Sequence, residues 1–177
     1  MRIKRVIAVA AAVLMSAAVL WQMYLRGFFL PSWVEWKEVS LTGDFDLDGK
    51  EETLQTEKKQ ILMDGNILLP KEWLISDLQS GDIDRDGRQE IILLVFNRQN
   101  FGRYRPVWEG KDQEKFYEHI YIYHYENGKL VPFWMSSQLK PELTSVLVRD
   151  DGMIEASDTM GEKSLWQWIT WGLERAD

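Results

Sequence analysis

The residues whose types and spacing predict chemistry lie in two ten-residue stretches, 43–52 and 81–90. Aligned without a gap, both hold a glycine, three Asp residues at alternate positions, a second glycine and a final Glu, with Lys50 opposite Arg88. Carboxylates at alternate positions of a chain that turns at glycine converge on one point, and they repel one another unless a hard cation lies between them. This internal repeat therefore predicts two Ca2+ sites.

The positions of the residues within each stretch distinguish the predicted sites from an EF-hand. Counted from Asp44, the first loop has carboxylates at positions 1, 3, 5 and 9, a glycine at 6 and a backbone carbonyl at 7, and the loop counted from Asp82 matches it. An EF-hand requires a bidentate Glu at position 12 and flanking helices. Position 12 is Gln55 in one loop and Leu93 in the other, and the flanks have strand patterns. The EF-hand is therefore excluded.

Ligation that ends at position 9 between two strands resembles the calcium loops of FG-GAP and VCBS repeats, the units of integrin-α-like β-propellers. The resemblance covers the two loops and their flanking strands closely, and the region to about Trp134 loosely. It implies that Lys50 and Arg88 contribute backbone carbonyls only, with their side chains in water. The family more often has Asp at position 9, where this chain has Glu. The implied side-chain ligands are Asp44, Asp46, Asp48 and Glu52 in the first loop and Asp82, Asp84, Asp86 and Glu90 in the second.

An Asp-Gly turn in a soluble hairpin is the alternative explanation, because Asp and Gly are common in turns for conformational reasons. Turn preference alone does not predict three alternating Asp residues and a Glu at a fixed distance, twice in one chain. Four carboxylates within ~5 Å of one another and without a cation would cost several kcal/mol. The calcium interpretation is therefore preferred.

The composition excludes other classes of site and partner. The 177 residues contain no cysteine, which excludes disulfides, zinc clusters, thiol nucleophiles and a lipid-modified N-terminal cysteine. The formal net charge is −7, and every acidic residue lies after residue 25. Nucleic acid needs basic surface for its phosphates, so no nucleic-acid partner is expected.

Residues 1–33 have the pattern of a membrane segment. A basic start precedes an uncharged run of mainly Ala, Val and Leu from Val6 to Leu25, and about 20 helical residues span a hydrocarbon core. The positive-inside rule places everything after Arg26 outside the cytoplasm. A single-pass cell-membrane anchor is therefore expected. The alternative is a signal peptide cut near Ser16-Ala-Ala18, which gives a secreted protein but leaves an apolar mature end from Val19.

Residues 34–177 predict an all-β extracytoplasmic domain of short antiparallel meander repeats. Val34–Leu41 alternates loosely in the manner of a strand. Asp64-Gly65 and Asn127-Gly128 are two-residue hairpin signals. Glu90–Phe96 is a β-rich apolar run, which is typical of a fully buried strand.

The third repeat is degenerate. Asp150-Asp151-Gly152 stands where a third acidic loop would be, but the alternating carboxylates are missing and no calcium is expected there. Ser164–Trp171 has bulky residues on both faces and predicts a strand that is buried on both. Three units are too few to close a propeller of four to eight blades, so a partial β-propeller is expected. Its open edges need cover from self-packing, from the aromatic tail or from another copy of the chain.

No catalytic constellation is apparent in the sequence. We find no Ser or Cys beside a base at a known spacing, no phosphate loop and no nucleotide fingerprint. His119 and His124 are predicted on opposite faces of one strand, where they cannot share a metal, and structural roles are expected for both. The chain is therefore not expected to be an enzyme.

The expected function is that of a membrane-anchored calcium-binding β-repeat protein acting as a binding or interaction module. An envelope protein or a glycan is the expected kind of partner. One alternative is a carbohydrate-binding module that uses exposed Trp and Tyr residues. Another is a metal-assisted hydrolase, which needs a second polar cluster around an open cleft. The candidate residues for a sugar-stacking platform are Trp108, Trp134, Trp166, Trp168 and Trp171.

Overall fold

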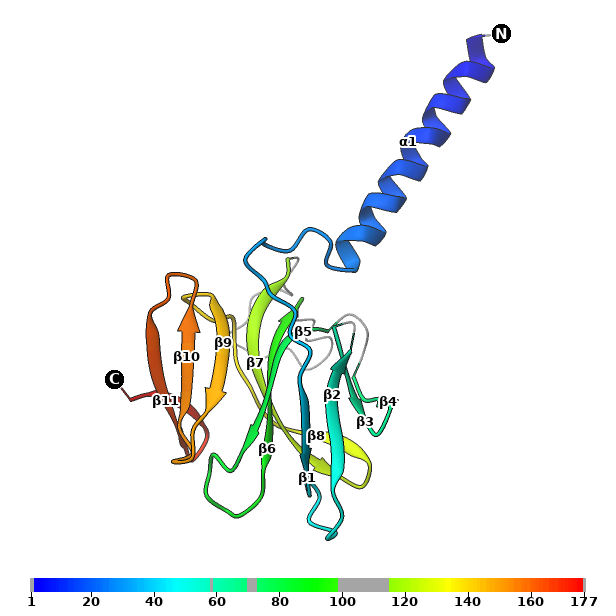
Figure 1. Cartoon of the computed structure of the whole chain (residues 1–177). Coiled ribbons are helices and arrows are strands. Elements are labelled where there is room, and N and C mark those ends of the chain that lie inside the picture. The colour runs from blue at the N-terminus through cyan, green and yellow to red at the C-terminus, as the bar shows by residue number, and fades with distance from the viewer. Residues whose placement is uncertain (1, 58, 70–72, 99–114, 177) are drawn as a thin grey trace. The chain divides into compact units, whose positions relative to one another are not determined.

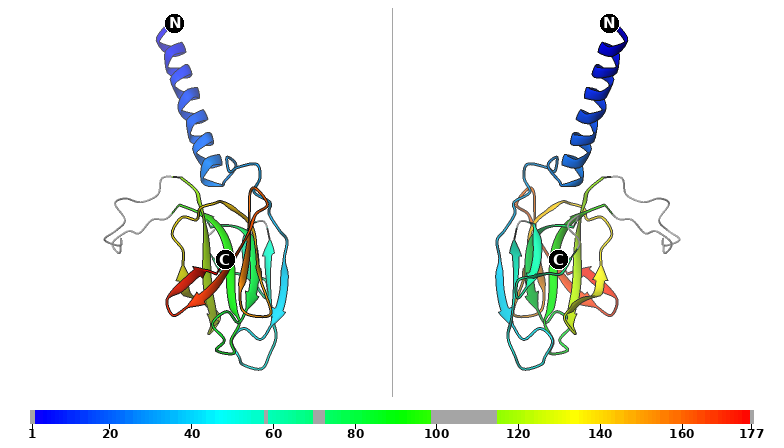
Figure 2. Two further views of the ribbon diagram at one scale, coloured as in Figure 1. Left: turned by 90° about the vertical axis from the view of Figure 1, so that its left-hand side faces the viewer. Right: turned by 90° about the vertical axis from the view of Figure 1, so that its right-hand side faces the viewer.

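The computed structural model describes the chain except for residues 1, 58, 70–72, 99–114 and 177. Contacts within the chain divide it into two compact units, Met1–Pro31 and Ser32–Asp177. The sequence predicted this boundary between residues 33 and 34. The first unit holds the helix α1, and the second holds every described strand (Figures 1 and 2).

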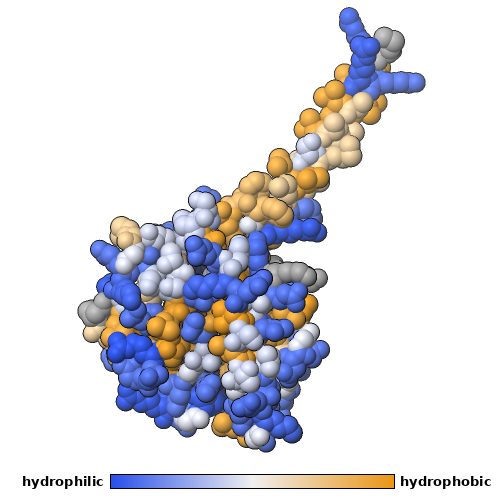
Figure 3. Space-filling view, viewed as in Figure 1, coloured by the Kyte–Doolittle hydropathy of each residue, from blue (hydrophilic) through white to orange (hydrophobic). Residues whose placement is uncertain are grey.

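The first unit is built on one apolar helix. α1 spans Arg2–Leu25, and none of its residues is buried. The helix is long and apolar enough to cross a membrane, since its 24 residues rise about 36 Å. Figure 3 shows apolar residues along α1 and hydrophilic residues at its N-terminal tip. A helix of this kind near the N-terminus fits a membrane anchor or a signal sequence.

The second unit contains three antiparallel four-stranded sheets, each made of strands that are consecutive in the sequence. The first sheet comprises β1 (Ser40–Gly43), β2 (Glu52–Glu57), β3 (Gln60–Met63) and β4 (Asn66–Ile67). The middle sheet comprises β5 (Leu74–Gly81), β6 (Glu90–Asn97), β7 (Tyr117–Glu126) and β8 (Lys129–Met135). The third comprises β9 (Leu143–Val148), β10 (Ile154–Asp158), β11 (Lys163–Ile169) and β12 (Gly172–Arg175). The predicted β meander is confirmed, and the sheets formed by the described residues do not close into a ring.

Two hairpin turns lie where the sequence predicts them. Asp64 and Gly65 join β3 to β4 with φ values of 47° and 80°. Asn127 and Gly128 join β7 to β8 with φ values of 52° and 76°. Positive φ at both central residues is the signature of a type I′ turn, whose twist matches that of the strands it connects. Local sequence therefore sets the register of both hairpins.

The middle sheet forms the centre of the unit because it packs on both of its faces. All eight residues of β6 are buried, as its apolar sequence predicts. Odd-numbered residues such as Ile91 and Leu93 share an apolar cluster with Phe45 and residues of the first sheet. Even-numbered residues such as Ile92 and Leu94 share a second cluster with residues of β9 and β10. The three sheets are therefore stacked face to face, with β5–β8 between the other two.

β11 is not buried on both faces, contrary to the prediction for Ser164–Trp171. Trp166 and Trp168 pack against the second apolar cluster, but no residue of β11 is fully buried. The third sheet is the last in the stack, so only one of its faces is covered by another sheet. Bulky composition alone does not distinguish such a strand from a central one.

The segment before β1 is also not the continuous strand predicted for Val34–Leu41. Only the last two of these residues belong to β1. The N–H of Lys37 donates to the carbonyl of Ser76 in β5, whereas the carbonyl of Val39 accepts the N–H of Thr56 in β2. The segment crosses from the middle sheet to the first, so it cannot pair along one strand.

A buried aspartate joins three parts of the second unit. Asp77 in β5 has no exposed surface and lies at a register shift in the pairing of β5 with β6. Its Oδ2 lies 2.5 Å from Nζ of Lys37 and accepts the N–H of Val146 in β9 at 3.2 Å. Its Oδ1 accepts the N–H of Leu78. Asp77 therefore connects the segment before β1, the middle sheet and the third sheet.

A second buried carboxyl lies in β7. Glu118 is 2% exposed, and its Oε2 accepts the N–H of Leu143 at the start of β9. Its Oε1 has no hydrogen-bond partner among the described residues. Burial raises the pKa of Glu118 to about 8, because the apolar surroundings disfavour the charged form. This carboxyl therefore keeps its proton at neutral pH.

We expect Gly81→Ala to destabilise the second unit by about 1–3 kcal/mol, the usual cost of overpacking. A Cβ at residue 81 would lie 2.5 Å from Cγ1 of Val148, and a valine side chain has little rotamer freedom with which to move away. Gly43→Ala is the matched control in the first repeat, since the atom nearest to a Cβ there is Gln89 Oε1 at 3.4 Å, followed by Cζ of Phe45 at 3.5 Å. Thermal unfolding measures both variants, and an equal loss would argue against the close approach of β9 to Gly81.

Candidate metal centres

The two acidic loops lie at the same end of the second unit (Figures 1 and 2). The first connects β1 to β2, and the second connects β5 to β6. The strand register pairs Gly43 with Glu52 and Gly81 with Glu90. The Glu at position 9 therefore begins a strand directly opposite the glycine that precedes position 1, so its side chain starts at the base of the loop.

Hydrogen bonds fold each loop around its own carboxylates. Asp44 accepts the N–H groups of Asp48 at 3.0 Å and of Gly49 at 2.9 Å. Glu52 reaches back to accept the N–H of Phe45 at 2.9 Å. The second loop repeats these three bonds at the same distances, with Asp82, Asp86, Gly87, Glu90 and Ile83 in the equivalent places. Two separate stretches of chain thus adopt one local geometry.

Left-handed backbone at two positions turns each loop sharply. In the first loop Leu47 and Gly49 have φ values of 62° and 86°, and in the second Arg85 and Gly87 have 64° and 92°. Glycine at position 6 adopts this conformation without steric cost. Position 4 is a residue other than glycine in the sparsely populated left-handed region. Both loops have this conformation at position 4, so it belongs to the backbone geometry that they share.

The turns bring most of the predicted ligands together. In the first loop four residues each place one oxygen within 4.8 Å of the others, namely Asp44, Asp46, Asp48 and Glu52. In the second loop three residues do so, namely Asp82, Asp84 and Glu90, and Asp86 is not part of this group. An ion that binds oxygens at 2.3–2.6 Å needs them within about twice that distance of one another. Both groups meet this limit.

The donor set fits a hard cation. All the grouped side chains offer carboxylate oxygens, which hard cations prefer to nitrogen or sulfur. A carboxylate has about four lone-pair sites, so the backbone N–H groups that each Asp accepts leave lone pairs for an ion. The existing hydrogen bonds also hold the oxygens in place before any ion arrives.

Burial and repulsion between carboxylates both raise the pKa of Glu90 in the second loop. Glu90 is fully buried, and burial together with repulsion from Asp84, Asp86 and Asp82 raises its pKa to about 7, against the opposing effect of the Ile83 N–H. An adjacent dication would favour the charged carboxylate and lower this pKa. The loop therefore has an electrostatic penalty that a bound cation would relieve.

The two basic side chains do not both point into water as predicted. Lys50 is 80% exposed, but its Nζ lies 2.8 Å from Oδ2 of Asp48, and this hydrogen bond lowers the pKa of Asp48. Arg88 departs further from the prediction, since its Nη1 lies 2.5 Å from Oε1 of Glu126 at the end of β7. The Arg88 side chain thus ties the second loop to the neighbouring hairpin.

His124 contacts the predicted ligand Glu90, and the sequence pattern alone does not indicate this contact. Its Nε2 lies 3.0 Å from Oε1 of Glu90, and its ring stacks on Phe133 in the second cluster. His119 stacks on Tyr121 in the first cluster, so the two histidines lie on opposite faces as predicted. The register of β6 with β7 was the missing signal, because it brings residue 124 beside residue 90.

The degenerate third loop packs against the second. A Cβ at Gly152 would lie 2.9 Å from the carbonyl oxygen of Asp82, and its φ of 74° also favours glycine. Nη2 of Arg85 donates to the carbonyl of Asp151 at 2.9 Å. The Asp151 carboxylate pairs with Arg149 at 3.0 Å. The third loop therefore supports the backbone of the second.

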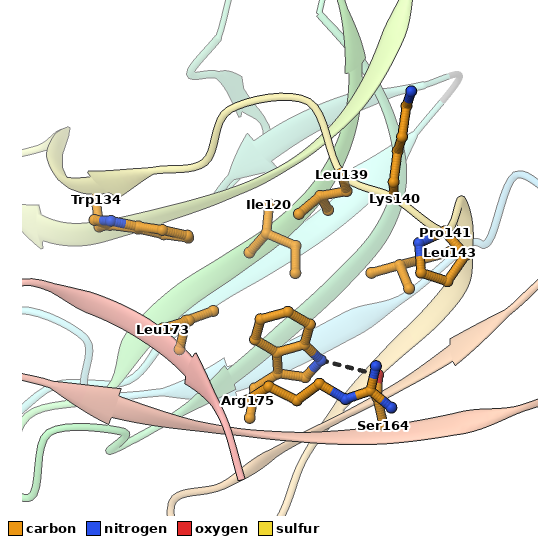
Figure 4. A pocket seen from close by; sticks show the side chains of 10 residues that line it. Ile120, Trp134, Leu139, Lys140, Pro141, Leu143, Ser164, Leu173 and Arg175 are labelled. Atoms are coloured by element: carbon orange, nitrogen blue, oxygen red, sulfur yellow. Dashed lines mark hydrogen bonds between the residues drawn. The ribbon is translucent and has the colours of Figure 1, made fainter. Parts of the chain in front are cut away.

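The tryptophans proposed as a sugar-stacking platform mostly face inward. Trp134, Trp166 and Trp168 pack against the second apolar cluster, and Figure 4 shows Trp134 among the side chains that line an apolar pocket there. Trp171 is 77% exposed, and Trp108 lies outside the described residues. The described candidates therefore form no continuous exposed strip.

The fold and the two loops define a three-sheet β-repeat protein with paired acidic sites. No family model, curated protein or solved structure matches the chain. The resemblance to FG-GAP and VCBS repeats consequently rests on the residues of the loops and their flanking strands.

Proposed function

We propose that this chain is a membrane-anchored, extracytoplasmic calcium-binding protein that serves as a binding or interaction module. The observation that carries the proposal is the duplication. Loops on two neighbouring sheets each gather carboxylate oxygens within 4.8 Å around the same pair of left-handed turns. Calcium in both loops stiffens this end of the domain, which then presents a defined surface to an envelope protein or a glycan.

Calcium is the proposed ion because of the donor type and number. Calcium takes six to eight oxygens in flexible geometry, whereas magnesium demands a near-ideal octahedron and keeps several waters. The proposed ligands of each loop are carboxylates from one short segment and the backbone carbonyl of Lys50 or Arg88. Such a ligand set fits the flexible coordination of calcium more readily than the rigid octahedron of magnesium.

The three stacked sheets are proposed to be blades of an incomplete propeller of the FG-GAP and VCBS type. Each sheet is a four-stranded antiparallel meander. An acidic loop, or its degenerate counterpart, follows the first strand of every sheet. Four-stranded sheets are the usual propeller blade, and closed propellers have four to eight of them.

α1 is proposed to remain attached as a single-pass anchor with the second unit outside the cytoplasm. The helix carries Arg2, Lys4 and Arg5 at its start and no acidic residue in its first turn, which by the positive-inside rule keeps this end in the cytoplasm. Calcium is plentiful outside cells, and extracellular sites work even at millimolar dissociation constants.

Catalysis is not part of the proposal. Oxygens that surround calcium on all sides leave no open position for a substrate, and calcium is a weak activator of bound water compared with zinc. The carboxylates of both loops accept backbone N–H groups. This arrangement supports a structural role for the ions rather than a catalytic one.

Calcium should raise the melting temperature of the full chain purified in detergent. An ion at 100 times its dissociation constant stabilises by about 2.7 kcal/mol per site, or roughly 5–10 °C for a domain of this size. Asp46→Ala and Asp84→Ala change the same position of the two loops. Each should remove about half of the shift, and the double variant should remove all of it. Parallel melts in calcium and in a chelator provide the measurement.

Glu51→Gln is the matched control, because the second loop already has Gln89 at that position and Glu51 is not among the grouped oxygens. This variant should keep the full shift. Identical melting temperatures in calcium and chelator would refute the proposal, and a shift that survives both Asp substitutions would place the ion outside the two loops.

A further inference from the structure

A polar pocket lies beside the second acidic loop. Its volume is about 320 Å³, and its lining includes Asp84 and Arg85 of the second loop, Asp151 and Gly152 of the third loop, and Gln167 and Trp168 of β11. Ligand pockets in proteins occupy about 300–1,000 Å³, so this one has room for a single small ring. No step of the calcium proposal uses Gln167 or Trp168.

The pocket presents charged groups of both signs. The Asp151 carboxylate pairs with Arg149 at 3.0 Å and accepts the N–H of Met153 at 3.2 Å. Arg85 donates to the Asp151 carbonyl, which uses one of the five N–H donors that a guanidinium carries. Asp84 belongs to the proposed metal ligands. An ionic ligand would therefore meet like charge as well as opposite charge, whereas a neutral hydroxylated ligand would find several directed donors and acceptors.

The aromatic part of the pocket is a tryptophan held in a stack. Phe133 stacks on Trp168 with ring centroids 4.6 Å apart and an interplanar angle of 25°, and Trp134 meets the same indole edge to face. These contacts fix the indole and cover part of it, and Trp168 contributes a small apolar patch to a pocket wall that is mainly polar. An aromatic surface beside amide, carboxylate and guanidinium groups suits a sugar ring, which has apolar C–H patches and hydroxyl groups at its rim.

We propose that a neutral sugar ring binds in this pocket, with Trp168 against its C–H surface and Arg85 and Gln167 on its hydroxyls. The inference rests in part on the proposed function, because calcium in the second loop is what neutralises and positions Asp84. It identifies the partner of the domain as a glycan that carries an accessible neutral sugar.

Calcium and sugar are coupled through two routes. Asp84 borders both the metal group and the pocket. Glu90 contacts His124, which stacks on Phe133, which in turn stacks on Trp168. Coupling of this kind is reciprocal. Because calcium neutralises and positions Asp84, it should strengthen sugar binding, and the sugar should then strengthen calcium binding by the same factor.

The test is ligand-observed saturation-transfer NMR on the full chain in a zwitterionic detergent, since maltoside and glucoside detergents carry sugar headgroups. Glucose, galactose, mannose and N-acetylglucosamine are titrated singly, with glucuronate as the charged comparison, in calcium and in chelator. At least one neutral sugar should bind with a millimolar dissociation constant and should bind at least fivefold more weakly in chelator. Absence of transfer from all four neutral sugars, or a preference for glucuronate over glucose, would overturn the inference.

The internal repeat supplies the matched variants. Arg85→Asn keeps a residue that tolerates the left-handed backbone and should weaken sugar binding about tenfold, as should Gln167→Ala. Leu47→Asn introduces the same residue at the equivalent exposed position of the first loop and should leave sugar binding unaltered. Equal affinities for the Arg85 and Leu47 variants would show that the sugar binds elsewhere.

Failure of this inference and failure of the calcium proposal give different results. If calcium raises the melting temperature but no neutral sugar shows saturation transfer, sugar binding in the pocket is overturned and the proposed function is still supported. Transfer that is equal in calcium and chelator, in a chain whose melt ignores calcium, supports sugar binding in the pocket but overturns both its coupling to calcium and the proposed function.

Discussion

Asp77→Ala should unfold about 10 °C below the wild-type chain, which corresponds to a loss of about 3 kcal/mol. The substitution deprives the buried N–H groups of Val146 and Leu78 of their acceptors and leaves the Lys37 ammonium without its partner. Breaking a buried ion pair typically costs 3–5 kcal/mol. The lower end of that range applies because the Lys37 side chain is 35% exposed and can turn towards water. Differential scanning calorimetry at neutral pH measures the change.

Two further variants make the Asp77 experiment specific. Asp77→Asn keeps an oxygen acceptor but removes the charge, so its loss should be intermediate. Lys163→Ala breaks the exposed pair that Lys163 forms with Glu155 at 2.6 Å, and exposed pairs contribute about 1 kcal/mol or less. If Asp77→Ala lowered the free energy of unfolding no more than Lys163→Ala does, the buried Asp77 connection between the sheets would not contribute to stability.

Glu118→Gln should abolish a pH-dependent loss of stability in the wild-type chain. The folded-state pKa of Glu118 is raised by burial from 4.5 to about 8, so between these values the folded protein holds a proton that the unfolded chain has released. Stability from this group is therefore highest below about pH 4.5 and falls as the pH rises to about 8. The total loss is on the order of a few kcal/mol. Gln resembles the protonated carboxyl and has no proton to lose.

The measurement is the free energy of urea unfolding of the wild type and Glu118→Gln at pH 5, 7 and 9. Other acidic groups titrate in both proteins, so the quantity of interest is the difference between them at each pH. This difference should be small at pH 5 and should grow in favour of Glu118→Gln by pH 9. A difference that stays constant across the three pH values would mean that Glu118 is not protonated in the folded state.

Features set by local sequence were predictable. The acidic loops and the Asp64-Gly65 and Asn127-Gly128 turns depend on residues a few positions apart, and the structure places them where the pattern indicates. The burial of β6 followed from its unbroken apolar composition. Each of these signals is contained within about ten residues of chain.

Features that depend on pairing between distant strands were not predictable. The contact of His124 with Glu90 joins residues 34 positions apart, and that of Asp77 with Val146 spans 69. The prediction that β11 is buried on both faces was wrong because a strand's own residues do not reveal whether its sheet is central or terminal in the stack. The polar pocket was missed for the same reason, since its walls come from three separate parts of the chain.

The place of the middle sheet in the stack has a consequence that we expect for folding during synthesis. β1–β4 leave the ribosome first, with Phe45, Leu54 and Ile61 lacking the partners that β6 and β7 later supply. Until then we expect the nascent chain to expose apolar surface, which is prone to aggregation. Once β5–β8 have docked, they offer a ready template on which β9–β12 can assemble. We therefore expect aggregation of the chain to be most favoured before its second repeat has been translated.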